Sequence, residues 1–196
     1  MDTSLLETLA AAPSDEETLV ERAQADRAAF AAVYDHFFRR VYNYVRYRVG
    51  SPEAADDVTA QIFEQVLRHL PEYQPRRGLF SAWLFRIARN AIYDDLRRRR
   101  RHPPLSLAAL GDRASDQFDP EQQVEDRLRR AHILGVIATL SEREQEVIAL
   151  KFGAELSNRQ IADLLKLSES NAGVILFRTL NKLRQLLRAE ENEHDE

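Results

Sequence analysis

The chain has 196 residues, of which 44% are hydrophobic and 31% are charged. This composition is too apolar for a wholly disordered chain and too charged for a membrane protein. Because no stretch of about 18 uncharged apolar residues occurs, we expect no membrane insertion. The N-terminus lacks the basic and apolar regions of a secretory signal, which indicates a cytoplasmic protein. The absence of cysteine excludes disulfides, thiolate metal sites and a cysteine nucleophile.

Charge is unevenly distributed along the chain, although the net charge is only −4. Residues 1–26 carry seven acidic residues and one basic residue, and residues 190–196 carry five acidic residues and no basic residue. Between these acidic ends, residues 68–102 hold ten arginines and three acidic residues. A basic segment of this kind is typical of a surface that contacts phosphates. We therefore expect the basic middle of the chain to bind a polyanion. We also expect the acidic ends to compete with that polyanion for the basic segment.

Apolar residues recur at helical spacing and strand-like alternation is absent, which predicts an all-α protein. Helices are predicted over residues 14–24, 27–49, 53–70, 79–100, 122–138, 142–151, 158–166 and 169–189. Capping-box spacing at Ser141 and Ser157 marks two of the helix starts. Proline, glycine, serine and aspartate between residues 103 and 121 favour an extended connector. The sequence thus predicts two small helical domains, 14–102 and 122–189, joined by a flexible linker (103–121) and flanked by an acidic extension (1–13) and an acidic tail (190–196).

The basic helix predicted over residues 79–100 has two different sides. At about 100° per residue, one side gathers apolar residues: Leu84, Ile87, Ala88 and Ala91. The opposite side gathers guanidinium groups, an amide and a phenol: Arg86, Arg89, Asn90, Tyr93 and Arg97. This second side can bind phosphates, hydrogen-bond base edges and stack on an unpaired base. Trp83 lies at the edge of the apolar stripe, where either core packing or base stacking is possible.

The second predicted domain contains a helix, a short turn at residues 166–168 and a second helix, which is helix-turn-helix spacing. The first turns of the second helix contain no lysine or arginine, so Ser170 and Asn171 are its polar groups for reading bases. Basic residues follow later in the helix, among them Arg178 and Lys182.

The sequence indicates no catalytic or metal site. The five histidines do not have zinc-ligand spacing, and glycine-rich phosphate loops are missing. The adjacent carboxylates Asp56-Asp57 and Asp94-Asp95 point about 100° apart on a helix and do not converge on a metal ion. We expect no enzyme activity, no metal and no cofactor.

Three stretches together resemble one protein family. LFSAWLFRIARNAIYDDLRRRRR (79–101) resembles the DNA-melting helix of bacterial sigma factors, and TLSEREQEVIALKFGAELSNRQIADLLKLS (139–168) resembles their C-terminal promoter-reading domain. The upstream ADDVTAQIFEQVLRHL (55–70) resembles the helix by which sigma factors hold core RNA polymerase. Their order and spacing are similar to the extracytoplasmic-function (ECF) type of the sigma-70 family.

The resemblance implies three partners, which are core RNA polymerase (its clamp and flap regions), promoter DNA and an anti-sigma factor. It implies polymerase contacts by Asp56, Asp57, Gln61, Phe63 and Glu64. It implies that the loop 73–81 forms a pocket for a flipped base, with minus-10 DNA contacts by Tyr73, Arg76, Arg77, Phe80, Trp83, Arg86, Arg89, Asn90, Tyr93 and Arg97. It implies minus-35 DNA contacts by Ser170, Asn171, Arg178 and Lys182.

The function that this resemblance implies is promoter-specific initiation, in which the protein binds core polymerase, directs it to a promoter and helps to melt the minus-10 element. Two alternatives stay open at this stage. One is a stand-alone helix-turn-helix regulator that does not join polymerase. The other is a polymerase-binding competitor that does not initiate, since Ala60-Gln61 stands where the family usually carries Gln-Glu.

Overall fold

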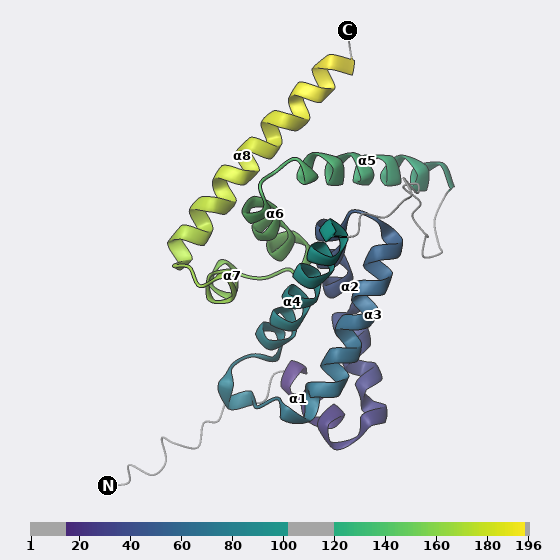
Figure 1. Ribbon diagram of the computed structural model, residues 1–196, viewed down its shortest axis with the longest axis vertical. Coiled ribbons are helices and arrows are strands. Elements are labelled where there is room, and N and C mark those ends of the chain that lie inside the picture. The colour runs from purple at the N-terminus through teal and green to yellow at the C-terminus, as the bar shows by residue number, and fades with distance from the viewer. Residues whose placement is uncertain (1–14, 102–119, 195–196) are drawn as a thin grey trace.

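The computed structural model describes residues 15–101 and 120–194, and within these two ranges it contains helices and no strands (Figure 1). The first range forms α1 (Asp15–Ala25), α2 (Phe30–Val49), α3 (Pro52–His69) and α4 (Phe80–Arg101). The second range forms α5 (Pro120–Ala138), α6 (Glu142–Ile148), α7 (Asn158–Leu165) and α8 (Glu169–His194). The all-α prediction is therefore confirmed, and the predicted helices match the observed ones closely.

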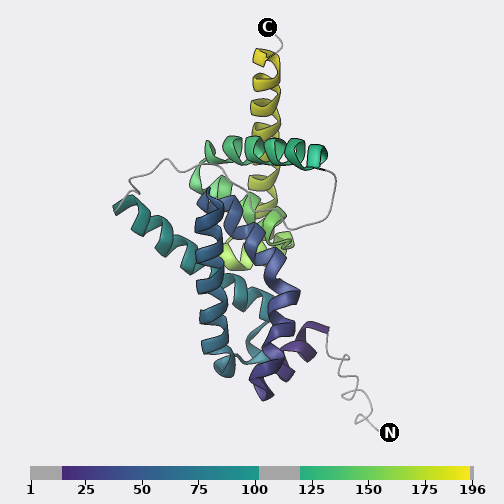
Figure 2. The same cartoon turned by 90° about the vertical axis from the view of Figure 1, so that its right-hand side faces the viewer.

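The N-terminal domain is a bundle of α2, α3 and α4, with α1 packed across one end (Figures 1 and 2). Its fully buried side chains include Phe37, Tyr44, Ile62 and Phe85, which come from all three bundle helices. The turn between α2 and α3 depends on Gly50, whose φ of 75° lies in the left-handed region that favours glycine. Short 3-10 turns fill the connections: η2 (Arg27–Ala29), η3 (Leu70–Glu72) and η4 (Pro75–Arg77).

The C-terminal domain consists of α5 to α8, with α5 lying across α8 (Figure 2). Both predicted capping boxes are present: Ser141 caps α6 with Glu144, and Ser157 caps α7 with Gln160. The helix predicted over 142–151 differs from the structure, because α6 ends at Ile148 and continues as a π-helical turn, η5 (Ala149–Gly153). The wider turn carries the backbone toward α2 and ends at Gly153.

The two domains pack against each other in this structure. One continuous apolar cluster combines residues of α2 and α4, such as Val45 and Phe85, with Leu150, Ala154 and Leu156 of the C-terminal domain. This docking was not predicted, because a sequence shows the apolar face of each helix but not which distant helix covers it. The predicted linker 103–121 and the acidic ends 1–13 and 190–196 fall largely or wholly outside the residues whose side chains the structure describes.

No helix in the described ranges is long and apolar enough to cross a membrane. Within the same ranges, no group of three or more histidine or carboxylate side chains is arranged to hold a metal ion.

Candidate nucleic-acid interface

Helix α4 presents the two sides that its sequence predicts. Leu84, Ala88 and Ala91 are buried in the bundle. Arg86, Asn90 and Arg97 are exposed, and Arg89 and Tyr93 are partly exposed beside them. The guanidinium of Arg89 lies 4.8 Å from the centre of the Tyr93 ring, which is a cation–π contact. The helix therefore presents Arg86, Asn90 and Arg97 to solvent, whereas Arg89 also pairs with the buried carboxylate of Glu146 at 3.2 Å and is only partly available.

A cavity of about 250 Å³ opens beside the start of α4, between the loop 72–79 and the first turns of the helix. Its lining combines an aromatic ring, a cation and several backbone and polar groups: Glu72, Tyr73, Gln74, Gly78, Leu79, Ala82, Trp83 and Arg86. An aromatic surface beside a cation suits a nucleic-acid base and its phosphate. The loop that forms the cavity is the one for which a base pocket was predicted.

Helix α1 holds this loop in place. The Gln24 side-chain amide donates to the backbone carbonyls of Leu70 and Tyr73, both at 2.9 Å. The Glu16 carboxylate accepts from the Ser81 backbone N–H at 2.7 Å, which satisfies a donor at the start of α4. Within the loop, the Tyr73 hydroxyl donates to the Gly78 carbonyl at 2.8 Å. The cavity is thus shaped before any ligand arrives.

The aromatic residues at the cavity differ in their accessibility. Phe80 is 1% exposed and packs against both Tyr73 and Trp83, at ring distances of 5.2 and 5.3 Å, while these two rings also contact each other at 5.4 Å, so Phe80 supports the cavity wall. Tyr73 is also largely buried, and this burial raises the pKa of its hydroxyl, as do the nearby carboxylates of Glu16 and Glu17. Trp83 is partly exposed, packs against the core with one part of its ring and lines the cavity, so base stacking by Trp83 stays a prediction.

The prediction that Phe80 contacts DNA directly is therefore corrected: Phe80 is buried and supports the cavity wall. Arg76 is exposed in η4. The side chain of Arg77 lies outside what the structure describes.

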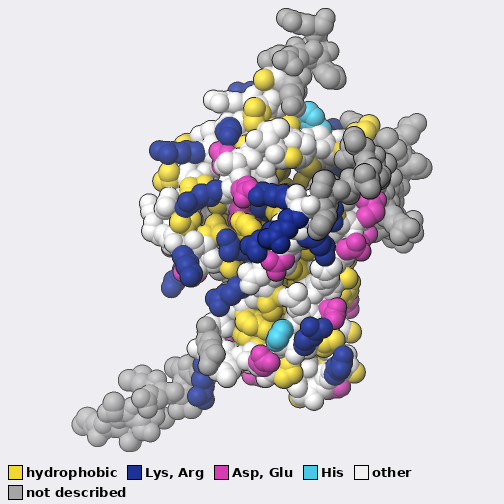
Figure 3. Space-filling view, viewed as in Figure 1, with side chains coloured by type: hydrophobic (Ala, Val, Ile, Leu, Met, Phe, Trp, Pro, Cys, Tyr) yellow, Lys and Arg dark blue, Asp and Glu magenta, His cyan; other side chains and the backbone are white. Residues whose placement is uncertain are grey.

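Arginine and lysine side chains gather around the C-terminal half of α4 (Figure 3). Asp95 is 2% exposed and pairs with both Arg98 and Arg99, while Arg100 pairs with Glu142 of α6. Three of the five arginines of the run 97–101 therefore have carboxylate partners within the chain. Among the described residues, Arg97 and Arg101 form no ion pair, so they are the cations of this run most available to a polyanion.

Four residues predicted to contact polymerase form one exposed face of α3: Asp56, Asp57, Gln61 and Glu64. Phe63 does not belong to this surface, because it is 4% exposed and packs under Tyr34 at a ring distance of 4.6 Å. Tyr34 and Phe38 of α2 are instead exposed beside it, by 39% and 37%. The sequence analysis missed these two aromatics. The sequence does carry a signal for them: α2 has four aromatic residues within nine positions, which is more than a single buried stripe of a helix can accommodate.

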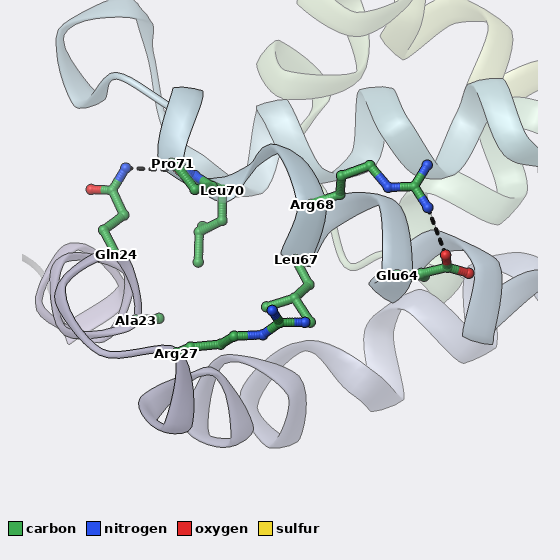
Figure 4. Close-up of a pocket in the computed structure, with 8 residues that line it drawn as sticks. All are labelled: Ala23, Gln24, Arg27, Glu64, Leu67, Arg68, Leu70 and Pro71. Atoms are coloured by element: carbon green, nitrogen blue, oxygen red, sulfur yellow. Dashed lines mark hydrogen bonds and ion pairs between the residues drawn. The ribbon is translucent and has the colours of Figure 1, made fainter.

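A second cavity, of about 460 Å³, separates α1 and η2 from the C-terminal half of α3 (Figure 4). Leu67 and Leu70 line it together with the side chains of Arg27 and Glu64. The Glu64 carboxylate accepts from Arg68 at 2.7 Å, one helical turn away. The cavity thus borders the exposed acidic face of α3, with paired charges at its rim.

The helix-turn-helix of α7 and α8 leaves its candidate DNA residues exposed: Ser170, Asn171, Arg178 and Lys182. The turn forms because Lys166 adopts the left-handed conformation (φ 55°) and the Ser168 hydroxyl accepts from the Asn171 backbone N–H. Lys182 pairs with Glu144 of α6 at 3.0 Å. Val174 and Phe177 of the same helix are exposed by 44% and 66% while Leu176 is buried.

Comparison with known proteins gives two family matches, one in each domain. Residues 33–102 match Sigma-70 region 2, and residues 136–185 match Sigma-70, region 4. Region 2 covers α2 to α4 and the base-sized cavity, and region 4 covers α6 to α8. Neither match covers residues 103–135, which include most of α5.

Individual relatives agree with these matches. ECF RNA polymerase sigma factor BldN of Streptomyces coelicolor is 33% identical over 170 residues, which are 86% of this chain and 64% of BldN, so the chain spans less than two thirds of that relative. ECF RNA polymerase sigma factor RpoE of Cereibacter sphaeroides is 33% identical over 171 residues, covering 84% of this chain and 89% of RpoE.

A solved structure resembles the fold of most of the chain. CnrH in complex with the cytosolic domain of CnrY superposes with a TM-score of 0.65 and 27% identity, covering 89% of this chain and 97% of CnrH. CnrH is an RNA polymerase sigma factor of Cupriavidus metallidurans. With both sigma-70 regions present in order and with relatives of this identity and coverage, the chain belongs to the ECF group of sigma-70 family RNA polymerase sigma factors.

Proposed function

We propose that this protein binds core RNA polymerase, directs it to specific promoters and helps to melt the minus-10 element so that transcription starts. The observation that carries the proposal is the cavity at the start of α4, which is lined by the exposed Arg86, one helical turn before the exposed Asn90. A protein that only docks on duplex DNA has no need of a pocket for an unpaired base. The match to Sigma-70 region 2, which spans the helix that lines the pocket, supports the proposal.

In this proposal, the minus-10 element is read as a single strand on α4. A base that leaves the duplex enters the cavity and stacks on Trp83, while Arg86 at the rim binds the adjoining phosphate. Flipping a base costs a few kcal/mol, and stacking returns about 1–3 kcal/mol per base. Asn90 lies one helical turn beyond Arg86 and can hydrogen-bond the edge of a second base.

The exposed face of α3 is the proposed surface for the polymerase clamp, with Asp56, Asp57, Gln61 and Glu64 as its polar contacts. Tyr34 and Phe38 add exposed aromatic area next to these acids. Aromatic residues surrounded by charged groups are typical of the centre of a protein–protein interface. Phe63 supports this surface from beneath and does not itself contact polymerase.

Region 4 is proposed to lie on duplex DNA at the minus-35 element. Ser170 and Asn171 begin the reading helix and face solvent, and Arg178 and Lys182 follow at spacings that suit phosphates. Because base-reading groups are few, most of the affinity of this domain for DNA comes from its backbone contacts and from polymerase.

The proposed role is one of binding and strand opening, without a reaction catalysed by this chain. Since it acts with RNA polymerase on the chromosome, we place it in the bacterial cytoplasm. CnrH is solved in complex with the cytosolic domain of CnrY. By analogy, we propose that this protein also has an anti-sigma partner that covers one of the surfaces described above.

Run-off transcription tests the proposal. Bacterial core polymerase is incubated with the protein and a library of genomic promoters, and transcripts are mapped to their start sites. We expect discrete start sites that require the protein and weaken at least tenfold with Asn90→Ala. Gln185→Ala, an exposed amide on α8, is the matched control and is expected to retain wild-type transcription.

Two outcomes would contradict the proposal in different ways. Binding to core polymerase without any transcript would favour the competitor that does not initiate. Failure to bind core polymerase, together with tight binding to a specific duplex, would favour the stand-alone regulator.

A further inference from the structure

We propose that the reading helix α8 recognises thymine methyl groups in the major groove of the minus-35 element through the apolar side chains of Val174 and Phe177. This inference rests on the proposed function, because it takes region 4 as the domain that lies on duplex DNA. It deepens that function by naming the class of DNA sequence that this chain selects. The expected element contains neighbouring T·A base pairs whose methyl groups face α8.

Val174 and Phe177 lie on the solvent face of α8, about one turn apart. Val174 is 44% exposed and Phe177 is 66% exposed. The opposite face of the same helix is buried and consists of Ala172, Leu176 and Thr179. At about 100° per residue, Val174 points almost directly away from the mean direction of these three residues. The apolar pair therefore faces away from the core of region 4.

The pair also lies in the part of the helix that reads bases. In a helix-turn-helix protein, the N-terminal residues of the second helix contact base edges. Val174 and Phe177 follow the exposed Ser170 by one and two turns, which forms one stripe along α8. Residues 169–177 contain no lysine or arginine. Along this stripe, the groups offered to bases are a hydroxyl, an isopropyl group and a phenyl ring.

The thymine methyl is the group in the major groove that such apolar side chains match. The other groups by which the four bases differ there are hydrogen-bond donors and acceptors. An isopropyl or phenyl group against a G·C pair leaves those donors and acceptors without a partner, which disfavours binding. Against a T·A pair, the same side chain removes a methyl group from water. Val174 and Phe177 therefore select thymine by attraction and also by exclusion of G·C pairs.

Asn171 is suited to the adenine that accompanies such thymines. Its side chain is exposed beside the stripe, less than one turn before Val174. An asparagine amide forms two hydrogen bonds with N6 and N7 of adenine. The Asn171 backbone N–H donates to the Ser168 hydroxyl at 3.2 Å, which fixes the start of the helix. A reader of adenine and two readers of thymine thus lie side by side.

Cations border the stripe where phosphates of the same duplex would lie. Arg178 directly follows Phe177 and is exposed. Helix α7 packs beside the start of α8 (Figure 1), and a Cβ atom on Gly173 would lie 3.6 Å from Nδ2 of Asn158. The next residue of α7, Arg159, is exposed. An apolar stripe bordered by cations suits a DNA groove, whose phosphates flank it, better than an apolar protein surface. Because phosphate contacts carry no sequence information, selection falls to the stripe.

Removal of methyl groups from selected DNA tests the proposal. Duplexes of a genomic promoter library are selected in parallel by the full chain alone and by the chain assembled with core RNA polymerase. The free chain is suitable because Val174 and Phe177 are exposed while the two domains pack together. The selected duplexes are then synthesised with deoxyuridine in place of thymidine at each thymine of their shared upstream element. This exchange removes the methyl group and leaves the base pair intact.

We expect thymine at neighbouring positions of the selected element. Deoxyuridine at a contacted position is expected to weaken binding about fourfold, which is the loss expected when one methyl group is no longer buried. Val174→Ala combined with Phe177→Ala is expected to bind the thymidine and deoxyuridine duplexes equally. Alanine favours helix at both positions, and circular dichroism verifies that the helix content is unchanged.

Two controls accompany this comparison. Deoxyuridine placed between the two promoter elements is the control in the DNA and is expected to leave binding unchanged. Leu128→Ala is the matched control in the protein, because it shortens an exposed apolar side chain of α5, and it is expected to keep the preference for thymidine. The ratio of the two affinities within one variant cancels any general change in its affinity for DNA.

Equal binding of thymidine and deoxyuridine duplexes by the wild type would overturn methyl recognition and leave the stripe to a protein partner. The same loss on deoxyuridine in the wild type and in the double variant would overturn the roles of Val174 and Phe177. Methyl recognition by the free chain without any transcript from polymerase would refute the proposed function and retain the present inference. Failure of both forms to select any duplex would overturn both proposals.

Discussion

Replacing Glu146 by leucine tests how much the buried contact contributes to stability. The variant keeps a side chain of similar length but leaves the Arg48 guanidinium, whose side chain is 1% exposed, without its carboxylate partner. Removing one member of a buried ion pair costs about 3–5 kcal/mol, because the other charge stays buried and unpaired. Losing the hydrogen bond of Tyr44 to a charged acceptor acts in the same direction.

The domains can avoid part of this cost by separating, since Arg48 and Tyr44 then reach water. The measured loss is therefore limited by the free energy of docking, and we expect a decrease of about 3 kcal/mol in the free energy of unfolding. Against a usual stability of about 5–15 kcal/mol, such a loss is readily measured. Equilibrium unfolding in urea, followed by far-UV circular dichroism, is suitable because urea does not screen charge.

A double variant separates the charge from the packing. Arg48→Met combined with Glu146→Leu removes both ions and is expected to recover most of the loss, as buried pairs replaced by apolar residues often do. Glu155→Gln breaks an exposed pair and is expected to change the stability by less than about 0.5 kcal/mol. Two results would contradict this expectation. One is a free energy of unfolding of Glu146→Leu within about 1 kcal/mol of the wild type. The other is a loss in the double variant as large as the sum of the losses in Glu146→Leu and in Arg48→Met.

Three further predictions follow from the described contacts. Trp83→Ala is expected to weaken binding of a single-stranded minus-10 oligonucleotide by about 1–3 kcal/mol while binding to duplex DNA changes little; equal losses for both probes would contradict the base pocket. Ser141→Ala removes the hydroxyl that caps α6 and is expected to lower the free energy of unfolding by about 1 kcal/mol in urea, with Ser141→Asp restoring it. The hydrogen bond from Arg100, and then its charge, lower the pKa of Glu142, so this exposed pair adds stability above the ordinary carboxyl pKa and loses it as the pH falls through the lowered value; because solvent screens the pair, the loss of stability on acidification, measured by urea unfolding, should be only slightly smaller in Glu142→Gln than in the parent.

Local features of the fold could be predicted because their causes are local. Ser141 and Ser157 cap their helices at the predicted residues, whereas α3 begins at Pro52, one residue before the predicted start. The two sides of α4 also follow from the spacing of its residues alone. Such features depend on contacts within one or two helical turns.

The π-helical turn could not be predicted from those rules. The sequence indicates a helix through residue 151, and Gly153 reads as an ordinary helix end. In the structure, Gly153 is required by the backbone of Tyr44, more than one hundred positions earlier in the chain. The reason for the glycine lies in another domain, so local patterns do not reveal it.

The burial of Glu146 could not be predicted from the sequence for a similar reason. In the sequence it stands among four charged or polar neighbours, Glu142 to Gln145, and resembles any solvent-facing carboxylate on a helix. Its burial comes from α2 and α4, which cover it only when the domains dock. The pairing of Arg100 in the basic run 97–101 could not be predicted for the same reason, because its partner Glu142 lies on α6.

The ion pairs of α6 explain how an acidic chain can carry a strongly basic helix. A sigma factor with a strongly basic helix would bind DNA nonspecifically if every cation were exposed, and nonspecific binding would compete with its assembly on polymerase. Here the acidic residues of α6 lie against the cations of α4 and α8, so the net charge of −4 and a DNA-binding surface are compatible.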